Sequence, residues 1–426
     1  MSRNRVFFVI MLVAALALSV GLASAQDSVT IRWWHINTAD PGLTNWQNLA
    51  DAFVEMHPNV TFEITVLENE AFKQQLITAM QAGDPPDLFQ SWGGGVLRTF
   101  AENGLVRDIS AQLEGEWKDS IAAQAALDLY GQDGSYYGVP WTWGAVGMFY
   151  NKALFAQAGL DPEAPPTTWD EFLAAVDTLK AAGITPISLG EGDKWPGHFW
   201  WVYLAIRLGG EEAFLKAYNR EGSFADEPFV QAGEYLNQLI EKNPFPEGFL
   251  AMTYGDQETV MGNGEAAMEL MGQWSPDVQR SNSESGEGLG DNLGWFPFPV
   301  VEGGAGNPTD VLGGGDGFAV GINAPDETIE FLRFITSEEN QRAMFAQNLV
   351  LPVVTGVDDL FVDAPVAAAI LNARNNAPYF QLYYDQFLPP SVGIAVNDAV
   401  ETLFAGSASP EDVAQAIEDA ASFELD

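Results

Sequence analysis

The stretch VTFEITVLENEAFKQQLITAMQAGDPPDLFQ, residues 60–90, decides the fold. Apolar and polar residues alternate over 60–66, which is typical of a strand with one buried face. Apolar side chains then recur at helical spacing, at Phe72, Leu76, Ile77 and Met80. After a Gly-Asp-Pro-Pro turn, the short run 87–90 predicts another strand. The stretch therefore predicts a strand, a helix and a strand in succession.

The residues before this stretch continue the same rhythm. Residues 29–34 predict a strand, and apolar residues at three- and four-residue spacing from Trp46 to Met56 predict a helix. Strands that alternate with helices form an open sheet with helices on both faces, because each helix buries its apolar side against the sheet. We therefore expect an α/β fold.

A second set of elements follows residue 140. Residues 145–150 predict a strand, and a capping box at 168–171 predicts the start of a helix that ends at Gly183. Further signals predict a strand at 318–322, helices at 327–336 and 338–348, and a final helix capped at 409–412. Because 426 residues exceed the size at which one core stops growing, we expect two lobes, joined by loops near residues 140 and 310.

The first 25 residues have the pattern of a secretory signal peptide. Arg3 and Arg5 precede an apolar run over 6–22, and Ala-Ser-Ala at 23–25 is a small-residue cleavage site before Gln26. An uncleaved membrane anchor is the alternative, because the apolar run approaches the roughly 20 residues that cross a bilayer. We expect cleavage, and an exported protein that is soluble in the periplasm or outside the cell.

The chain contains no cysteine. A lipid-carrying cysteine at the signal junction, a thiol nucleophile and a thiolate metal site are therefore excluded. Exported proteins can form disulfides, but this chain has no cysteine with which to form one. Its stability must therefore come from its core alone.

The charge of the chain excludes other classes of partner. There are 59 acidic and 18 basic residues, a net charge of −41. Without Arg3 and Arg5 the basic count is 16, and 16 − 59 gives −43. Such a surface repels nucleic acid and anionic lipid, and it makes acidic ligands poor candidates. The acidity itself fits either simple solubility or a saline or hot habitat.

Motifs for catalysis are scarce. The three histidines, His35, His57 and His198, lack the helical spacing of a metal site. Neither a phosphate-binding loop nor a G-x-S-x-G motif is present. Paired carboxylates for glycoside hydrolysis are expected by chance among so many acids, so an exported glycoside hydrolase remains an alternative. We expect no catalytic residue, no metal and no cofactor.

Tryptophans gather in segments that predict loops, at Trp92, Trp141, Trp143, Trp195 and Trp274. In an open α/β sheet the ends of the strands face the ligand crevice, so residues just beyond them are well placed to bind. A flat aromatic ring covers the apolar face of a sugar, while amides, carboxylates, Lys and His bind its hydroxyls. Core packing is the alternative role for each single tryptophan.

Several motifs together resemble a known family. They are RWWH at 32–35, GDPPDLFQSWGGG at 83–95, GSYYGVPWTWGAVGMFYNKALFAQAG at 134–159, KWPGHFWWVYLAIRLGG at 194–210 and LGGGDGFAVG at 312–321. Over essentially the whole mature chain the sequence is similar to the extracellular solute-binding proteins of ABC transporters. Within them it resembles the oligosaccharide-binding group, which includes raffinose and xylo-oligosaccharide binders.

That resemblance implies a periplasmic-binding-protein type II fold. Each lobe is then discontinuous, with residues 26–139 plus 311–352 in the first and 140–310 plus 353–426 in the second. A neutral oligosaccharide of the xylo, raffinose or malto type binds between the lobes, which close on it by a hinge motion. The loaded monomer is presented to the permease subunits of an ABC transporter, through which alone it contacts the membrane. A surface lectin is a further alternative, because it would also bind sugar. It differs from a transport receptor in that it would not close on the ligand.

The resemblance also implies a set of ligand contacts. From the first lobe and the hinge these are Asn37, Asp40, Asn69, Trp92, Gly93, Gly94, Trp141 and Trp143. From the second lobe and the last crossover they are Lys194, Trp195, His198, Tyr254, Gln273, Trp274 and Asp316. We expect Trp143, Trp195 and Trp274 to stack on sugar rings. We expect Asp40, Asp316 and Lys194 to bind hydroxyls.

The segment EGDKWPGHFWWVY, residues 191–203, illustrates both roles of its aromatic residues. Gly and Pro in its first half predict a loop, whereas the second half has the density of a buried helix. We expect Trp195 and its polar neighbours to line the cleft, and Trp200, Trp201 and Tyr203 to anchor them from below.

Overall fold

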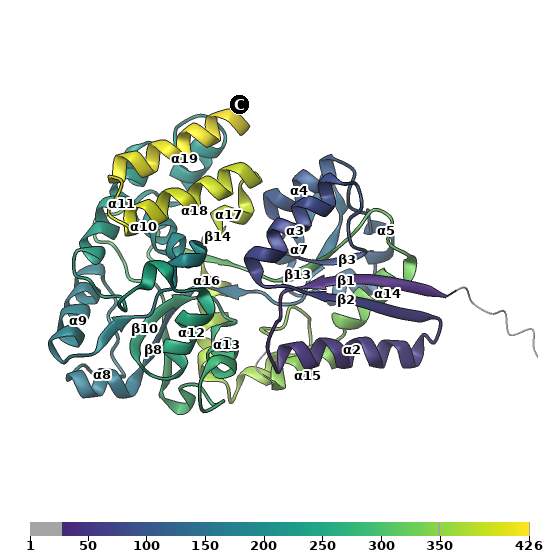
Figure 1. The fold of residues 1–426 in the computed structure, drawn as a ribbon, viewed down its shortest axis with the longest axis horizontal. Coiled ribbons are helices and arrows are strands. Elements are labelled where there is room, and N and C mark those ends of the chain that lie inside the picture. The colour runs from purple at the N-terminus through teal and green to yellow at the C-terminus, as the bar shows by residue number, and fades with distance from the viewer. Residues whose placement is uncertain (1–27, 348–349, 426) are drawn as a thin grey trace, which may run out of the picture.

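The computed structural model describes residues 28–347 and 350–425. The predicted signal peptide, residues 1–25, lies outside the described residues. Figure 1 shows two lobes side by side, each built from helices around a sheet. Within the described residues, no helix is long and apolar enough to cross a membrane.

The first lobe is built on a sheet with the strand order β2-β1-β3-β13-β6. Its strands are β1 (Val29–His35), β2 (Val60–Val66), β3 (Leu88–Ser91), β6 (Gly138–Pro140) and β13 (Gly317–Val320). β1 runs parallel to β2 and β3, and β13 runs antiparallel to β3 and β6. The sheet therefore combines the first part of the chain with a strand that lies far later in the sequence.

Helices cover both faces of this sheet, as predicted. On one face lie α2 (Gly42–Met56), α14 (Asp326–Ile335) and α15 (Glu338–Ala346), and on the other α3 (Asn69–Gln81) and α4 (Gly94–Glu102) (Figure 1). The side chains of β3 alternate between the two faces, because Leu88 joins the core under α2 whereas Phe89 joins the core under α3. Shorter elements complete the lobe: α5 (Ser110–Leu113), α6 (Glu116–Ser120), α7 (Gln124–Asp128), β4 (Gly131–Gln132) and β5 (Ser135–Tyr136).

The second lobe contains a four-stranded sheet with the order β11-β8-β10-β9 and a smaller sheet with the order β14-β12-β7. The strands of the larger sheet are β8 (Gly147–Asn151), β9 (Thr185–Ile187), β10 (Ala266–Met271) and β11 (Leu293–Phe296). Those of the smaller sheet are β7 (Gly144–Ala145), β12 (Val311–Gly314) and β14 (Phe380–Leu382).

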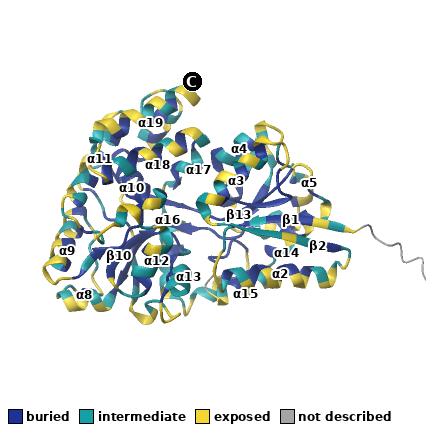
Figure 2. Cartoon of the chain, viewed as in Figure 1, coloured by how far each residue is buried: buried dark blue, intermediate teal, exposed yellow. Residues whose placement is uncertain are grey.

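Helices surround these sheets and bury a large core (Figure 2). Along the chain they are α8 (Lys152–Ala158), α9 (Trp169–Ala181), α10 (Trp195–Tyr218), α11 (Glu227–Ile240), α12 (Tyr254–Gly262), α13 (Ser275–Asn282), α16 (Pro365–Asn376), α17 (Tyr384–Phe387), α18 (Pro390–Phe404) and α19 (Pro410–Glu424). Single 3₁₀ turns lie at Glu191–Asp193, Phe249–Ala251, Gly290–Asn292 and Asp358–Phe361. The predicted capping boxes are confirmed at Thr168 before α9 and at Ser409 before α19.

Two short crossovers connect the lobes, and the chain passes from the first lobe to the second once more between α15 and α16. Strand pairing changes from one sheet to another between β6 and β7, over residues 141–143, and between β12 and β13, over residues 315–316. The crossovers lie against each other, since a Cβ added at Gly315 would lie 2.1 Å from the carbonyl oxygen of Thr142. A side chain at this position would separate the two segments. The predicted lobe boundaries lie beside these changes of sheet and stay a prediction.

Candidate functional site

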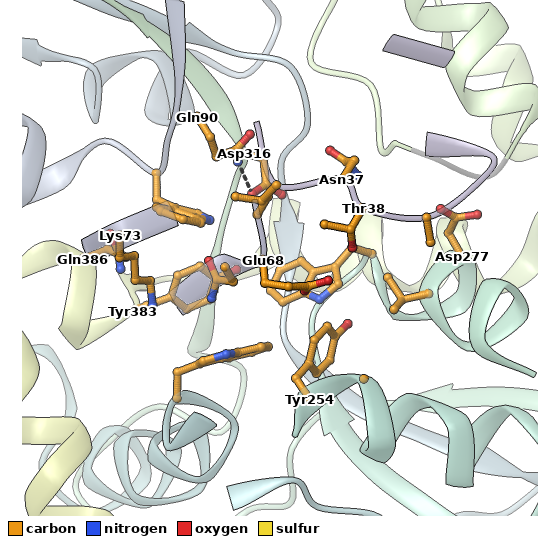
Figure 3. Close-up of a pocket in the computed structure, with 18 of the residues that line it drawn as sticks. Asn37, Thr38, Glu68, Lys73, Gln90, Tyr254, Asp277, Asp316, Tyr383 and Gln386 are labelled. Carbon is orange, nitrogen blue, oxygen red and sulfur yellow. Dashed lines mark hydrogen bonds between the residues drawn. The ribbon is translucent and has the colours of Figure 1, made fainter. Parts of the chain in front are cut away.

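A cavity of about 250 Å³ lies between the lobes. From the first lobe it is lined by the ends of β1 and β3 and the start of α3, and from the second by α10, α12, α13 and the segment 383–386. Figure 3 shows Lys73 and Gln386 at one end of it, and Asn37 and Asp277 at the other. The carboxyl ends of β1 and β3 thus face the cavity, as expected for an open α/β sheet.

Three aromatic rings form the wall that the second lobe contributes. The ring of Trp195 lies 4.7 Å from that of Tyr254, and 6.4 Å from that of Trp274, measured between centroids. The first pair is inclined by 58° and the second by 52°, so the rings form a curved surface. Such a surface presents several aromatic faces to one ligand.

The start of α10 holds Trp195 in this wall. Trp195 is the first residue of α10, and Lys194 before it has a positive φ of 65°. The buried Glu191 packs against the first turn, because a Cβ added at Gly197 would lie 1.9 Å from its Oε2 atom. Asp193 accepts a hydrogen bond of 2.7 Å from the backbone N–H of Tyr254. The short turn before α10 therefore fixes two of the three rings.

The residues of α10 that follow its first turn belong to the core, as predicted. Trp200, Trp201 and Tyr203 are each at most 1% exposed. Tyr203 donates a hydrogen bond of 2.6 Å to the carbonyl oxygen of Val146 beside β8. These contacts make the support of Trp195 rigid, which preorganises a binding surface.

Asp316 forms part of the opposite wall, at the second crossover. Its Oδ1 atom accepts a hydrogen bond of 2.7 Å from Nε2 of Gln90 (Figure 3). Burial raises the pKa of Asp316 to about 7, although the hydrogen bonds from Trp92 and Gln90 favour the charged form. This carboxyl group therefore changes its charge near neutral pH.

Asn37 reaches the cavity from the end of β1, where three side chains orient one another. Its backbone N–H donates to Nδ1 of His35 over 3.3 Å, and its Oδ1 atom accepts from Nε1 of Trp46 over 2.8 Å. Burial lowers the pKa of His35 to about 4, so the imidazole is neutral and can accept this bond. The bond from Trp46 thus orients the side-chain amide of Asn37.

A charged cluster closes one end of the cavity. Nζ of Lys73 lies 2.9 Å from Oε1 of Glu70 and 3.5 Å from Oδ2 of Asp385. Burial by itself would lower the pKa of Lys73, but the two carboxylates outweigh it and raise the pKa. His198 lies beside them, with its Nε2 atom 3.9 Å from Oδ1 of Asp385. Burial lowers the pKa of His198 more than Asp385 raises it, so the imidazole is neutral.

Several buried polar atoms at the cavity have no hydrogen-bond partner among the described residues. They are Oδ1 of Asn69, Oε1 of Gln90, Nε1 of Trp141, Nε1 of Trp195 and Oη of Tyr383. Leaving a buried polar group unpaired costs about 1–3 kcal/mol. A ligand with hydroxyl groups would recover part of that cost.

Nine of the predicted contact residues line the cavity: Asn37, Asn69, Trp92, Trp141, Trp195, His198, Tyr254, Trp274 and Asp316. They come from segments that are far apart in the sequence. The structure thus brings together most of the predicted set, while their roles in binding stay a prediction.

Six predicted residues lie outside the cavity lining. The side chain of Asp40 accepts hydrogen bonds from Thr44 at the start of α2. Lys194 forms an ion pair of 2.7 Å with Asp398 on α18. Trp143 is buried behind the cavity, where its ring stacks on Phe380 at 4.2 Å.

The other three lie in tight backbone packing. Gln273 lies against Gly144, where an added Cβ would be 2.6 Å from its amide. A Cβ at Gly93 would lie 2.6 Å from the carbonyl oxygen of Leu129, and one at Gly94 would lie 2.6 Å from that of Gln386. Both glycines also have a positive φ. Close backbone approach therefore explains this glycine run without a ligand.

Other lining residues were not predicted. The most informative are Lys73 on α3, Gln90 at the end of β3, Asp277 on α13, and Tyr383, Asp385 and Gln386 near α17. The sequence FQLYYDQFLPP at 380–390 places aromatic, acidic and amide residues before a Pro-Pro stop, and this mixture was the available signal. Among the described residues, no group of three His, Asp or Glu side chains is placed to hold a metal ion.

Comparisons with known proteins agree with this architecture. The model of a family described as bacterial extracellular solute-binding protein matches residues 40–342. A solved structure from work on xylan utilization by Caldanaerobius polysaccharolyticus is similar, with a TM-score of 0.85 and 28% identity, covering 92% of this chain and 99% of that one.

Two curated proteins are also similar in sequence. The diacetylchitobiose binding protein of Streptomyces coelicolor is 27% identical over 343 residues, which cover 78% of this chain and 74% of that protein. The sn-glycerol-3-phosphate-binding periplasmic protein of Pectobacterium atrosepticum is 23% identical over 421 residues, which cover 93% of this chain and 91% of that protein.

Proposed function

The chain belongs to the bacterial extracellular solute-binding protein family, and from that premise we propose that it captures a neutral oligosaccharide between its lobes for an ABC importer. The observation that carries this proposal is the cavity itself. It combines the inclined rings of Trp195, Tyr254 and Trp274 with buried polar atoms that have no partner among the residues the structure describes.

Sugar chemistry matches both features. The apolar faces of a pyranose pack on aromatic rings, while its equatorial hydroxyls donate and accept hydrogen bonds at the edges. The residues that line the cavity include amide acceptors at Gln90 and Asn69 and indole donors at Trp141 and Trp195, and these atoms have no partner among the described residues. A hydroxyl group can serve both kinds of partner, so an uncharged polyhydroxylated ligand satisfies the site without a new charge.

The charges of the cavity favour a neutral ligand over an anionic one. Lys73 is the one Lys or Arg among the described lining residues, and Glu70 and Asp385 already pair with it. The other ionisable groups include the acidic Glu68, Asp277 and Asp316. Similarity to a glycerol-3-phosphate-binding protein therefore does not outweigh the local electrostatics, because a phosphate would find no free cation here.

Relatives support the class of ligand and leave its identity open. One similar structure comes from work on xylan utilization, and one similar protein is a diacetylchitobiose binding protein. We propose a xylo-, raffinose- or malto-type oligosaccharide for this chain. The connections between the lobes would act as the hinge on which they close, and the loaded monomer would meet the permease outside the membrane.

The proposal is tested by a binding screen on the mature protein. Xylo-oligosaccharides, raffinose, maltodextrins, cellobiose and chitobiose would be compared with glycerol 3-phosphate in thermal-shift and tryptophan-fluorescence assays. A ligand at 100 times its Kd adds about 2.7 kcal/mol to native stability. We expect a shift with at least one neutral sugar, and recovery of that sugar intact.

Other outcomes would change the assignment. Stabilisation by glycerol 3-phosphate alone would replace the neutral sugar with an anionic ligand. Release of shorter sugars would indicate a glycoside hydrolase. Binding without compaction in small-angle scattering would favour a lectin, because the proposed receptor closes on its ligand.

A further inference from the structure

An ion pair joins the two lobes at one end of the cavity. Lys73 belongs to α3 in the first lobe, whereas Asp385 belongs to α17 in the second. Their charged atoms are 3.5 Å apart, and the side chain of Asp385 is 9% exposed. Lys73 also lies 5.7 Å from the centre of the Trp92 ring, which adds a cation–π contact. The pair is therefore part of the cavity wall.

A second hollow of about 100 Å³ lies beyond this pair. It is enclosed by α3, the start of α4, α17 and α18. Five residues line both the cavity and this second hollow: Lys73, Gln90, Trp92, Asp385 and Gln386. These residues form the partition between the two spaces, and the ion pair bridges the lobes within it.

The second hollow has a lining similar in kind to that of the cavity. Its lining includes the buried Phe72, Phe89 and Phe100 of the first lobe and Ile394 of α18, which is 52% exposed, together with polar residues such as Glu70 and Gln74. The buried Oδ1 atom of Asn397 has no hydrogen-bond partner among the described residues. An apolar surface with one unsatisfied acceptor suits a further sugar ring as well as it suits any other neutral group.

We propose that the Lys73–Asp385 pair sets the length of saccharide that this protein accepts. The inference rests on the proposed function, because it concerns the ligand of the same cavity. The chain end of the bound saccharide abuts the partition, and the second hollow is the space that one more ring would occupy if the partition were removed. Lys73 and Asp385 are thus specificity-determining residues.

The test measures affinity against chain length. Xylo-oligosaccharides and maltodextrins of two to six units would be titrated into the wild type and into Lys73→Ala/Asp385→Ala. Both charges are removed together, because removing one leaves the other buried and unpaired. For each protein we would compare the affinity for longer chains with the affinity for the chain length that the wild type binds best. We expect this ratio to be at least about tenfold higher in the double variant than in the wild type.

Two controls separate the partition from simple loss of charge and from general damage. Lys73→Met/Asp385→Asn keeps the bulk of both side chains, so we expect it to keep the wild-type length preference. Lys216→Ala breaks an exposed ion pair with Glu212 on α10 and should leave the preference unchanged. If the double alanine variant does not fold, Lys73→Ala/Asp385→Asn shortens the lysine side chain without leaving a buried charge unpaired.

The outcomes distinguish this inference from the proposed function. Equal weakening for every length would mean that the pair only clasps the lobes, and the inference would be wrong. An unchanged length profile would overturn it as well. If the wild type binds no sugar of either series or of the wider screen, the proposed function itself fails and the inference fails with it.

Discussion

Two tryptophans that were given the same role in sugar stacking occupy different regions of the molecule. Trp195 at the cavity and Trp143 in the hinge are 7% and 5% exposed, so burial does not separate them. Their neighbours do. Trp195 lines the cavity, and its Nε1 atom has no partner in the described part of the chain, whereas Trp143 stacks on Phe380 and packs with Val353, Val354 and Val357. The surroundings of a ring, and not its exposure, indicate whether it can bind a ligand.

We expect the largest effect from substitution of Trp143 in the hinge. Trp143→Ala removes a ring from a packed cluster, and such a change costs about 3–5 kcal/mol. We expect the free energy of unfolding to fall by that amount, measured by chemical denaturation followed by circular dichroism. The affinity of the folded variant for sugar should stay within about threefold of wild type, because the two effects are separate. A large loss of affinity with unchanged stability would show that Trp143 acts in binding and not in packing.

For Trp195, which lines the cavity, we expect the opposite result: a loss of sugar affinity with little loss of stability. Trp195→Ala should lower the affinity for sugar by about 2–4 kcal/mol, or roughly 30- to 1,000-fold, because a buried aromatic at the centre of a site carries much of the binding energy. Isothermal titration calorimetry would measure this loss, with the melting temperature as the control for folding. Trp195→Phe keeps a flat ring and should recover part of the affinity. Unchanged binding by the alanine variant would remove Trp195 from the site.

The charge state of Asp316 should make sugar affinity depend on pH. Its pKa is raised by burial from 3.8 to about 7. The stability that comes from keeping this group protonated is therefore complete below about pH 4 and is lost as the pH rises through 7. Sugar hydroxyls donate to the charged form, so we expect affinity to rise about tenfold from pH 6 to pH 8.

Asp316→Asn is the control for this pH dependence, because an amide has the same shape and does not titrate. The variant should bind with nearly the same affinity across the range. Asp277 also lines the cavity, with a pKa raised by burial to about 6, and the comparison between variant and wild type separates the two groups. A slope that survives in the variant would assign the pH dependence to Asp277 or another group.

Lys194 provides the smallest expected effect. Although it precedes Trp195, its side chain is 41% exposed and pairs with Asp398 outside the cavity. Lys194→Ala should change sugar affinity by no more than about twofold, since exposed ion pairs contribute little. Calorimetry beside the Trp195 variant would measure it. A loss comparable to that of Trp195→Ala would show that the side chain reaches the ligand after closure.

Much of the fold followed from local patterns. The strand and helix over 60–81, the buried second half of the 191–203 segment and the capping boxes at Thr168 and Ser409 all appear where expected. These features depend on residues within one or two turns of each other. The glycine run after Trp92 stays a predicted contact, and the positive φ angles and close backbone contacts of Gly93 and Gly94 reflect packing on distant segments.

From the sequence alone followed the α/β class and the exclusion of thiol chemistry, together with the expectation of a site rich in tryptophan. Only the tertiary structure decided which tryptophans face the cavity, and that Lys73 meets Asp385 across 312 residues of chain. The physical reason is the range of the interactions. Periodicity and capping act between near neighbours in sequence, whereas a cavity between two lobes is defined by side chains that meet only after both lobes have packed.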